Sequence, residues 1–207
     1  MIKQFVNPHR ASNNWLINLD STNCLIVDIG NFNQNLLFDF LEKTQKKVVA
    51  IVLTHEHADH TFGLSKLQEH IDVPVFCTAI CAKNVADKRQ NFSYYLEDIE
   101  TFEYHFSPTV VEDFLRFEFY GNELEFFETP GHSPGGLILR VNRCWFTGDT
   151  ILNHIKTPLN FPHSNKVSFN ESLTKVSPHF QIGDEIYPGH GDPFTFKFHN
   201  QFEFCTK

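Results

Sequence analysis

Apolar residues fall into short runs along the chain, and their spacing predicts strands alternating with helices. Four apolar positions, 36, 37, 40 and 41, recur at the spacing of one helical face and predict a helix over 35–47. Other helices are expected at 61–71, 79–90 and 169–178, the last capped by Asn170. Runs rich in β-branched and aromatic residues predict strands at 14–19, 24–30, 48–54, 74–77, 124–130, 136–141, 144–150 and 185–190. This alternation is typical of the α/β class.

Two segments interrupt the alternation. Residues 91–120 are aromatic and acidic without clean periodicity, and we interpret them as an irregular insertion over the scaffold. Its tyrosines Tyr94, Tyr95 and Tyr104 are candidates for substrate contact. The stretch 151–168 is rich in Pro, Asn and His and predicts a long loop. Because no linker separates the two halves, we predict a single domain over residues 1–207.

Composition and charge narrow the class of partner. The net charge is −8 and no basic run occurs, which argues against nucleic acid and anionic membrane surfaces as partners. The amino terminus lacks the apolar core of a signal peptide, so we expect a soluble cytoplasmic protein. Five scattered cysteines are expected to be free thiols in that reducing compartment: Cys24, Cys77, Cys81, Cys144 and Cys205. A small-molecule substrate remains the expected partner, and the oligomeric state is open.

Four polar clusters follow apolar runs: "THEHADH", "TPGHSPGG", "FTGDT" and "YPGHG". Loops after strands gather at one edge of a sheet in α/β architectures, so these clusters are expected to meet in space. They contribute seven imidazole and carboxylate groups: His55, His57, Asp59, His60, His132, Asp149 and His190.

So many proton-binding groups in one pocket would repel or compete for protons unless a cation compensates them. Neutral imidazole and ionised carboxylate are ligands of zinc, iron and manganese, and seven donors exceed one tetrahedral shell of about four. Two metals sharing a bridging carboxylate fit that number. His55 and His57 are two residues apart, which suits an extended or turning backbone and not a helical zinc motif.

The four clusters, in this order, resemble those of the metallo-β-lactamase-fold hydrolases, and within them the glyoxalase II-like branch. The resemblance spans residues 14–192 and implies a four-layer αβ/βα sandwich with the metals at one edge of its two sheets. By the same resemblance, His55, His57 and His132 look like ligands of a first metal, and Asp149 like the bridging carboxylate. The ligands of the second metal would be Asp59, His60 and His190.

The resemblance implies a hydrolase with two zinc ions, although iron or manganese also suits the donors. Its substrate would be a thioester, ester or lactone, attacked by a metal-bound hydroxide whose pKa is lowered to about 7. We expect Asp59 to orient this hydroxide and shuttle its proton, and Thr54, Glu56 and Thr150 to fix imidazole tautomers. Two alternatives are open: a persulfide dioxygenase with one iron on His55, His57, His132 and Asp149, and a non-catalytic metal-binding protein.

Overall fold

Two six-stranded mixed sheets form the framework of the computed structural model, which describes residues 1–8, 10–31, 33–197 and 202. The first sheet has the order β1 (Ile2–Val6), β2 (Asn13–Asn18), β3 (Asn23–Val27), β4 (Lys47–Val52), β5 (Val75–Cys77) and β6 (Thr109–Val110). The second has the order β12 (Phe194–Thr195), β11 (Glu185–Pro188), β10 (Cys144–Gly148), β9 (Leu137–Val141), β8 (Asn122–Glu128) and β7 (Arg116–Phe119). Strands β3 to β6 are parallel neighbours, as are β10 and β11.

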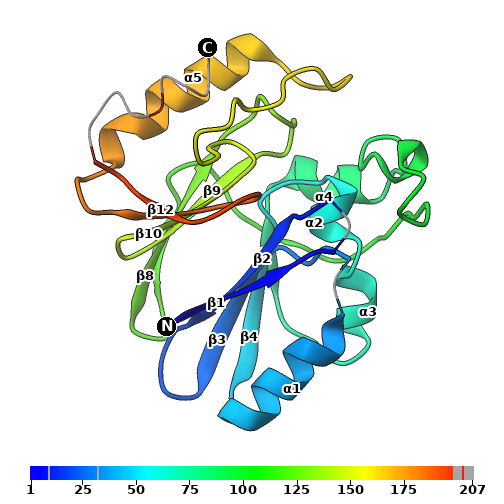
Figure 1. The fold of residues 1–207 in the computed structure, drawn as a ribbon, viewed down its shortest axis with the longest axis vertical. Helices are drawn as coiled ribbons and strands as arrows, with labels where there is room; N and C mark the ends of the chain where they lie inside the picture. The colour runs from blue at the N-terminus through cyan, green and yellow to red at the C-terminus, as the bar shows by residue number, and fades with distance from the viewer. Residues whose placement is uncertain (9, 32, 198–201, 203–207) are drawn as a thin grey trace.

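The described residues contain five α-helices, and three of them lie on the outer sides of the two sheets (Figure 1). The five are α1 (Gln34–Thr44), α2 (Ala58–Thr61), α3 (Leu64–Gln68), α4 (Ala79–Val85) and α5 (Lys166–Val176). Figure 1 shows α5 on the outer side of the second sheet and α1 and α3 on that of the first. This arrangement confirms the predicted αβ/βα sandwich of four layers.

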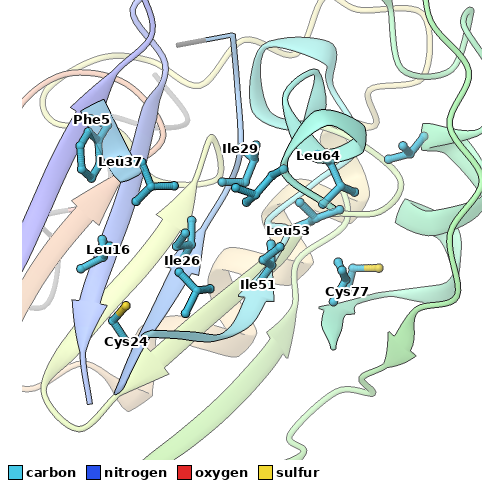
Figure 2. Packing of buried hydrophobic residues seen from close by; sticks show 14 of the residues in the cluster. Phe5, Leu16, Cys24, Ile26, Ile29, Leu37, Ile51, Leu53, Leu64 and Cys77 are labelled. Atoms are coloured by element: carbon cyan, nitrogen blue, oxygen red, sulfur yellow. The ribbon is translucent and has the colours of Figure 1, made fainter. Parts of the chain in front are cut away.

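Three hydrophobic clusters fill the spaces between these layers. Alternate residues of a strand point to opposite faces, so Leu25 packs between the sheets while its neighbour Ile26 packs toward the helices. Figure 2 shows Ile26 and Ile51 among the side chains of the helix-facing cluster, with Leu37 and Leu64 from α1 and α3. In the second sheet, Phe126 faces the inner cluster, and Phe127 joins Phe169 and Leu173 of α5 in the third.

Each predicted strand overlaps an observed one, and most observed strands end earlier than predicted. After β4, β8, β10 and β11, the residues lost from the predicted ends lead into the four polar clusters, where the backbone leaves the sheet. Strands β1, β6, β7 and β12 were not predicted. Two of them, β6 and β7, lie within the expected irregular stretch 91–120, of which 96–108 contains neither helix nor strand.

The helix predictions need correction at their ends and at one cap. The helix expected over 61–71 corresponds to the shorter α3, and α2 ends before it at Thr61. The helix expected over 79–90 is α4, which ends at Val85. Asn170 does not cap α5. The N-cap is Asn165, whose Oδ1 accepts hydrogen bonds from the backbone N–H groups of Val167 and Ser168.

Four cysteines, Cys24, Cys77, Cys81 and Cys144, are free thiols, as expected, and Cys205 lies outside the described residues. Within the described ranges, none of the helices has the length and apolar character needed to span a bilayer.

Candidate metal centre

The seven predicted ligands come from four loops, each directly after a strand. His55 follows β4, and His57 precedes the short helix α2 that carries Asp59 and His60. The remaining three, His132, Asp149 and His190, follow β8, β10 and β11. Backbone hydrogen bonds join the loops: Leu137 N–H donates to Thr54 O at 2.7 Å across the two sheets, and Gly189 N–H donates to Gly148 O at 2.8 Å.

His55, His57 and His132 form a first group, with one nitrogen from each within 4.8 Å of the others. His132 Nε2 lies 3.1 Å from His57 Nδ1, and the ring of His55 is 4.6 Å from that of His57. All three side chains are buried. The first group therefore presents three convergent imidazoles to one point.

Asp59, His60 and His190 form a second group whose ligand atoms also lie within 4.8 Å of one another. Asp59 Oδ2 is 3.3 Å from His190 Nε2 and 3.8 Å from His60 Nε2. His190 and Asp59 remain partly exposed, at 24% and 16% of their side-chain surface, whereas His60 is fully buried. The second group is thus the side of the centre open to solvent.

The carboxylate of Asp149 lies between the two groups. Its Oδ2 is 3.5 Å from His132 Nε2 in the first group and 3.4 Å from His190 Nε2 in the second. Its Oδ1 is 3.5 Å from His60 Nε2. This is the position that a carboxylate shared by two cations would occupy.

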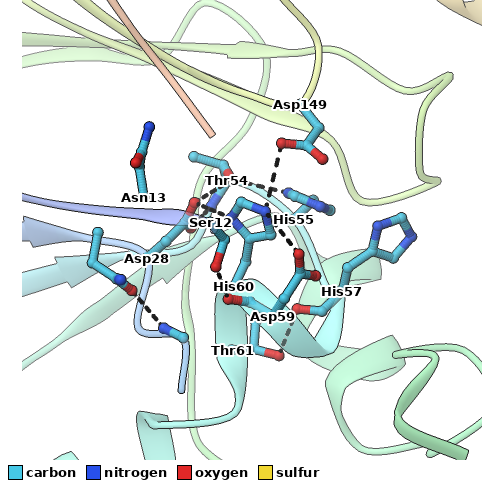
Figure 3. A network of polar contacts seen from close by, with 12 residues as sticks. Ser12, Asn13, Asp28, Thr54, His55, His57, Asp59, His60, Thr61 and Asp149 are labelled. Atoms are coloured by element: carbon cyan, nitrogen blue, oxygen red, sulfur yellow. Dashed lines mark hydrogen bonds and ion pairs between the residues drawn. The ribbon is translucent and has the colours of Figure 1, made fainter. Parts of the chain in front are cut away.

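A buried aspartate that the sequence analysis missed, Asp28, supports two of the ligands (Figure 3). Its Oδ2 lies 2.8 Å from His60 Nδ1 and accepts a hydrogen bond from the Thr54 hydroxyl at 2.7 Å. The Thr54 hydroxyl is in turn 3.0 Å from His55 Nδ1. Because the Thr54 hydroxyl donates its proton to Asp28, it can only accept from His55, so His55 Nδ1–H is the donor to Thr54. With Nδ1 as the donor in both His55 and His60, the Nε2 atoms of these imidazoles keep their lone pairs for the centre.

The signal for Asp28 was present in the sequence as one carboxylate inside the apolar run "CLIVDIG". The backbone of Asp28 is left-handed, with φ of 60°, and Asp tolerates this conformation better than a β-branched residue would. A third predicted ligand, His132, is also oriented through its Nδ1 atom, because its Nδ1–H donates to the backbone oxygen of Pro158 at 2.8 Å.

The charges of the second group hold protons on its histidines in the absence of a cation. Burial opposes protonation of His60, but Asp59, Asp149 and Asp28 outweigh it and raise the pKa of His60 to about 9. Burial opposes protonation of His190 as well, and Asp149 and Asp59 raise its pKa to about 11. Burial would raise the pKa of Asp59, but His60 and His190 lower it to about 2.

The first group has the opposite tendency. Burial, reinforced by His132, lowers the pKa of His57 to about 3, and burial with the neighbouring imidazoles also lowers the pKa of His55. Neutral imidazoles and an ionised carboxylate are the protonation states in which these side chains bind a cation.

Two unpaired buried atoms are an independent indication that the donor set binds a divalent cation. His55 Nε2 and Asp149 Oδ1 are buried without a hydrogen-bond partner, and both belong to the convergent groups. Buried polar atoms without partners are costly, and a cation between them would remove that cost. Gly189 is needed for this approach, because a Cβ there would collide with the Asp149 carboxylate and lie 2.9 Å from the His60 ring.

Glu56 does not face the centre. It is fully buried, and its carboxylate accepts hydrogen bonds from Asn84 Nδ2 at 2.8 Å, Ser133 Oγ at 3.1 Å and Gly135 N–H at 3.2 Å. Glu56 therefore joins the "THEHADH" loop to α4 and to the turn after His132.

Of the other residues named in the sequence analysis, some contact a predicted ligand and others do not. Thr54 contacts His55 as expected, whereas the hydroxyl of Thr150 is 3.1 Å from that of Thr129. Tyr94 and Tyr95 are exposed, and Tyr104 donates a hydrogen bond to Gln68 Oε1.

Known proteins resemble the chain in both sequence and structure. A model of the metallo-β-lactamase superfamily matches residues 7–190. A probable metallo-hydrolase from Streptococcus pyogenes serotype M6 is 25% identical over 198 residues, 90% of this chain and 82% of that protein. A hydroxyacylglutathione hydrolase from Cronobacter sakazakii is 31% identical over 140 residues, 67% of this chain. The match covers 47% of that relative, so the chain spans less than half of its length.

Solved structures share the fold at lower identity. The BLEG-1 B3 metallo-β-lactamase superposes with a TM-score of 0.86 at 22% identity, over 100% of both chains. TTHA1623 in a di-iron-bound form has a TM-score of 0.78 at 20% identity, over 93% of this chain and 94% of its own. ETHE1 from Myxococcus xanthus has a TM-score of 0.75 at 16% identity, over 98% of this chain and 82% of its own. The family match and the shared sandwich agree: the chain belongs to the metallo-β-lactamase superfamily.

Proposed function

We propose that the protein is a dizinc hydrolase of a thioester, ester or lactone, acting on a small molecule in the cytoplasm. The observation that carries the proposal is the position of Asp149, whose two oxygens lie about equally near His132 of one donor group and His60 and His190 of the other. The family match and the relatives named as metallo-hydrolases support metal-dependent hydrolysis as the reaction class.

When bound by these residues, a divalent cation would supply a water of lowered pKa, about 7, and a Lewis acid for a carbonyl oxygen. The chain's own side chains supply the remaining requirements. Asp59 has its pKa held at about 2, so it stays ionised and can accept a hydrogen bond from the attacking water. Its partial exposure, at 16%, lets it pass a proton on to solvent. Asp28 keeps the Nε2 lone pair of His60 directed at the centre.

Zinc is proposed because neutral imidazoles and carboxylates form its usual hydrolytic sites, and because no cysteine belongs to the described donor groups. The same donors accept iron and manganese, and a solved structure of the same fold is described in a di-iron-bound form. Metal identity must therefore be measured.

A second candidate is a dioxygenase acting on a persulfide with one iron held by His55, His132 and Asp149, with His57 beside them. The resemblance of the fold to ETHE1 favours keeping it as a competitor. Two histidines and a carboxylate suit Fe(II) and O₂. This candidate, however, leaves Asp59 and His190 without a role, although they lie 3.3 Å apart at the open side of the centre.

Elemental analysis of the purified protein, combined with thioester, lactone and persulfide assays, tests the proposal. Two zinc ions per chain with turnover of a thioester or lactone would support it. One iron per chain with oxygen uptake and no hydrolysis would establish the dioxygenase instead. Metal without any turnover across the panel would favour a non-catalytic metal-binding protein.

A further inference from the structure

A row of aromatic side chains borders one side of the metal centre. We call Phe92, Tyr95, Phe161 and His163 the aromatic wall. Phe92 lies edge-on to the His57 ring with centroids 4.8 Å apart, and Phe161 is 5.4 Å from His57 and 5.5 Å from His132. The rings of Phe92 and Phe161 are 5.4 Å apart, and Tyr95 and His163 each lie 6.0 Å from Phe92.

Exposure increases along the wall from the metal centre outward. Phe92 is 8% exposed, Phe161 38% and Tyr95 56%. A core cluster would bury all of its rings, whereas these rings lead from two predicted metal ligands to the surface.

Phe92 is held in place by the metal-binding loop itself. Its backbone adopts a left-handed conformation, with φ of 66°, which is strained for a residue with a bulky side chain. The preceding residue, Asn91, accepts a hydrogen bond from Ala58 N–H at 2.8 Å, and its side-chain amide donates to Val85 O and Phe102 O at 3.0 Å each. These bonds maintain the strained conformation and fix the ring relative to His57.

Phe161 belongs to a different segment, which is fixed to the turn of His132. Ser164 N–H donates to Phe161 O at 3.0 Å, and the Ser164 hydroxyl donates to His132 O at 2.7 Å. Asn165 N–H donates to Gly131 O at 2.7 Å. The wall is therefore assembled from two segments that are far apart in sequence and separately attached to ligands of the first group.

The surroundings of the second donor group are polar. The Ser12 hydroxyl donates to Asp59 O at 2.6 Å, and the backbone of Ser12 pairs with that of His190. In the same loop, the Arg10 guanidinium is paired with Asp98, and its charge interacts with that of Asp59. A substrate bound across the centre thus meets hydrocarbon beside His57 and His132 and polar groups beside Asp59 and His190.

We propose that the hydrolysed substrate carries an apolar acyl group, and that this group packs on Phe92 and Phe161 of the aromatic wall. The inference rests on the proposed hydrolysis at this centre and adds the substrate class. The acyl carbonyl lies next to the first donor group, and the polar leaving group is directed toward Asp59 and His190. Burying each methylene against the rings makes longer acyl chains bind more tightly.

Binding of the acid products tests this inference without requiring turnover. Acetate, butanoate, hexanoate and octanoate are titrated calorimetrically into the zinc-reconstituted protein, and N-acetylcysteamine thioesters of the same acids are assayed for kcat/KM. We expect the Kd to fall about two- to fourfold per added methylene, the range between a half-buried and a fully buried CH₂. Equal Kd values across the series would overturn the inference.

Phe161→Ala is the informative variant, because this exposed loop residue can be truncated without opening the core. It should flatten the dependence of Kd on chain length, with the largest loss of affinity for octanoate and the smallest for acetate. Phe114→Ala is the matched control: Phe114 is 46% exposed, like Phe161 at 38%, and packs on Phe127 and His179, outside the wall. A uniform loss for all four acids in Phe161→Ala, acetate included, would contradict a role in acyl recognition.

The two proposals fail separately. Hydrolysis of every thioester at the same kcat/KM, together with equal Kd values, would support the hydrolase and overturn the acyl inference. Chain-length-dependent binding without hydrolysis of any thioester, ester or lactone carrying these acyl groups would support the apolar subsite and contradict the hydrolase.

Discussion

Asp28 Oδ2 and His60 Nδ1 lie 2.8 Å apart, with both side chains buried and with the imidazole between Asp28 and the metal centre. The same oxygen accepts the Thr54 hydroxyl, and Asp28 Oδ1 accepts the Thr54 backbone N–H at 2.7 Å. One carboxylate thus orients a ligand of the second group directly and a ligand of the first group, His55, through Thr54.

Replacing Asp28 with Asn should weaken metal binding without removing a ligand. The amide has one acceptor oxygen where the carboxylate had two. If its NH2 group replaces Oδ1, the Thr54 backbone N–H loses its acceptor; if it replaces Oδ2, His60 Nδ1 and the Thr54 hydroxyl both lose theirs, and the imidazole can adopt the wrong tautomer. Loss of such an outer partner typically lowers metal affinity by about 10- to 100-fold. Competition titration with a chromophoric zinc chelator measures the affinity of each site.

Asp184→Asn is a suitable control for that experiment. Asp184 is also a buried carboxylate with several donors, among them Trp145 Nε1 at 2.8 Å and Arg143 Nε at 2.9 Å, but it lies outside the metal centre. The control should lower thermal stability and leave zinc affinity unchanged. Equal loss of affinity in the two variants would show that Asp28 acts only through general stability.

Asp149→Ala should lower the occupancy of both metal sites together. The side chain reaches His132 in one group and His190 in the other, so its removal takes a donor from both. Elemental analysis after dialysis against a limiting zinc buffer should give fewer than two zinc ions per chain, with activity reduced in parallel. Full occupancy in this variant would exclude a bridging position for Asp149.

Glu56 variants should separate a structural role from a catalytic one. Glu56→Ala leaves Asn84, Ser133 and Gly135 with unpaired buried donors, and the free energy of unfolding should fall by about 2–4 kcal/mol. Glu56→Gln keeps the shape and one acceptor and should cost less. Denaturant unfolding gives the free energies, and kcat of Glu56→Gln gives the catalytic effect. A loss of kcat of about 10²-fold or more with full zinc occupancy would identify Glu56 as a general base.

Much of the centre could be predicted because its chemistry is concentrated in local motifs. Each of the four clusters follows an apolar strand, and the loops after these strands bring their seven side chains together in space. The strand ends were overestimated because Thr54 and Thr150 are compatible with a strand in isolation. Only the tertiary fold determines where the backbone turns to present a ligand.

The residues that escaped prediction depend on contacts between distant segments. The position of Asp28 in an apolar run marks it as unusual, but only the tertiary fold brings His60 beside it and shows its role. The aromatic wall was equally hidden, because Phe92 and Phe161 are 69 positions apart in a chain of 23 phenylalanines. Strand β1 was missed because its polar positions 3 and 4 obscure the alternation of an edge strand.

The two donor groups should give the metal-free protein a stability maximum near pH 6.5. The raised pKa values of His60 and His190, about 9 and about 11, mean that the folded state holds protons which the unfolded state releases above the ordinary value of 6.5. Their contribution is complete below pH 6.5 and is lost as the pH rises through the folded values. His57, with its pKa lowered to about 3, acts in the opposite direction, because below pH 6.5 the unfolded state binds the extra proton.

Added zinc should stabilise the protein more at alkaline pH than at acidic pH. A cation requires the neutral form of His60 and His190, so binding at neutral pH must displace protons and grows stronger as the pH rises. The increase in Tm on adding zinc should therefore be larger at about pH 8.5 than at about pH 6, and calorimetry in buffers of different ionisation enthalpy should detect proton release. His163 offers a matched control outside the predicted ligands, since His163→Gln should leave this pH dependence intact while His190→Gln weakens it. A zinc-induced shift in Tm that is constant or declines with pH would mean that these two histidines are not the groups that bind the metal.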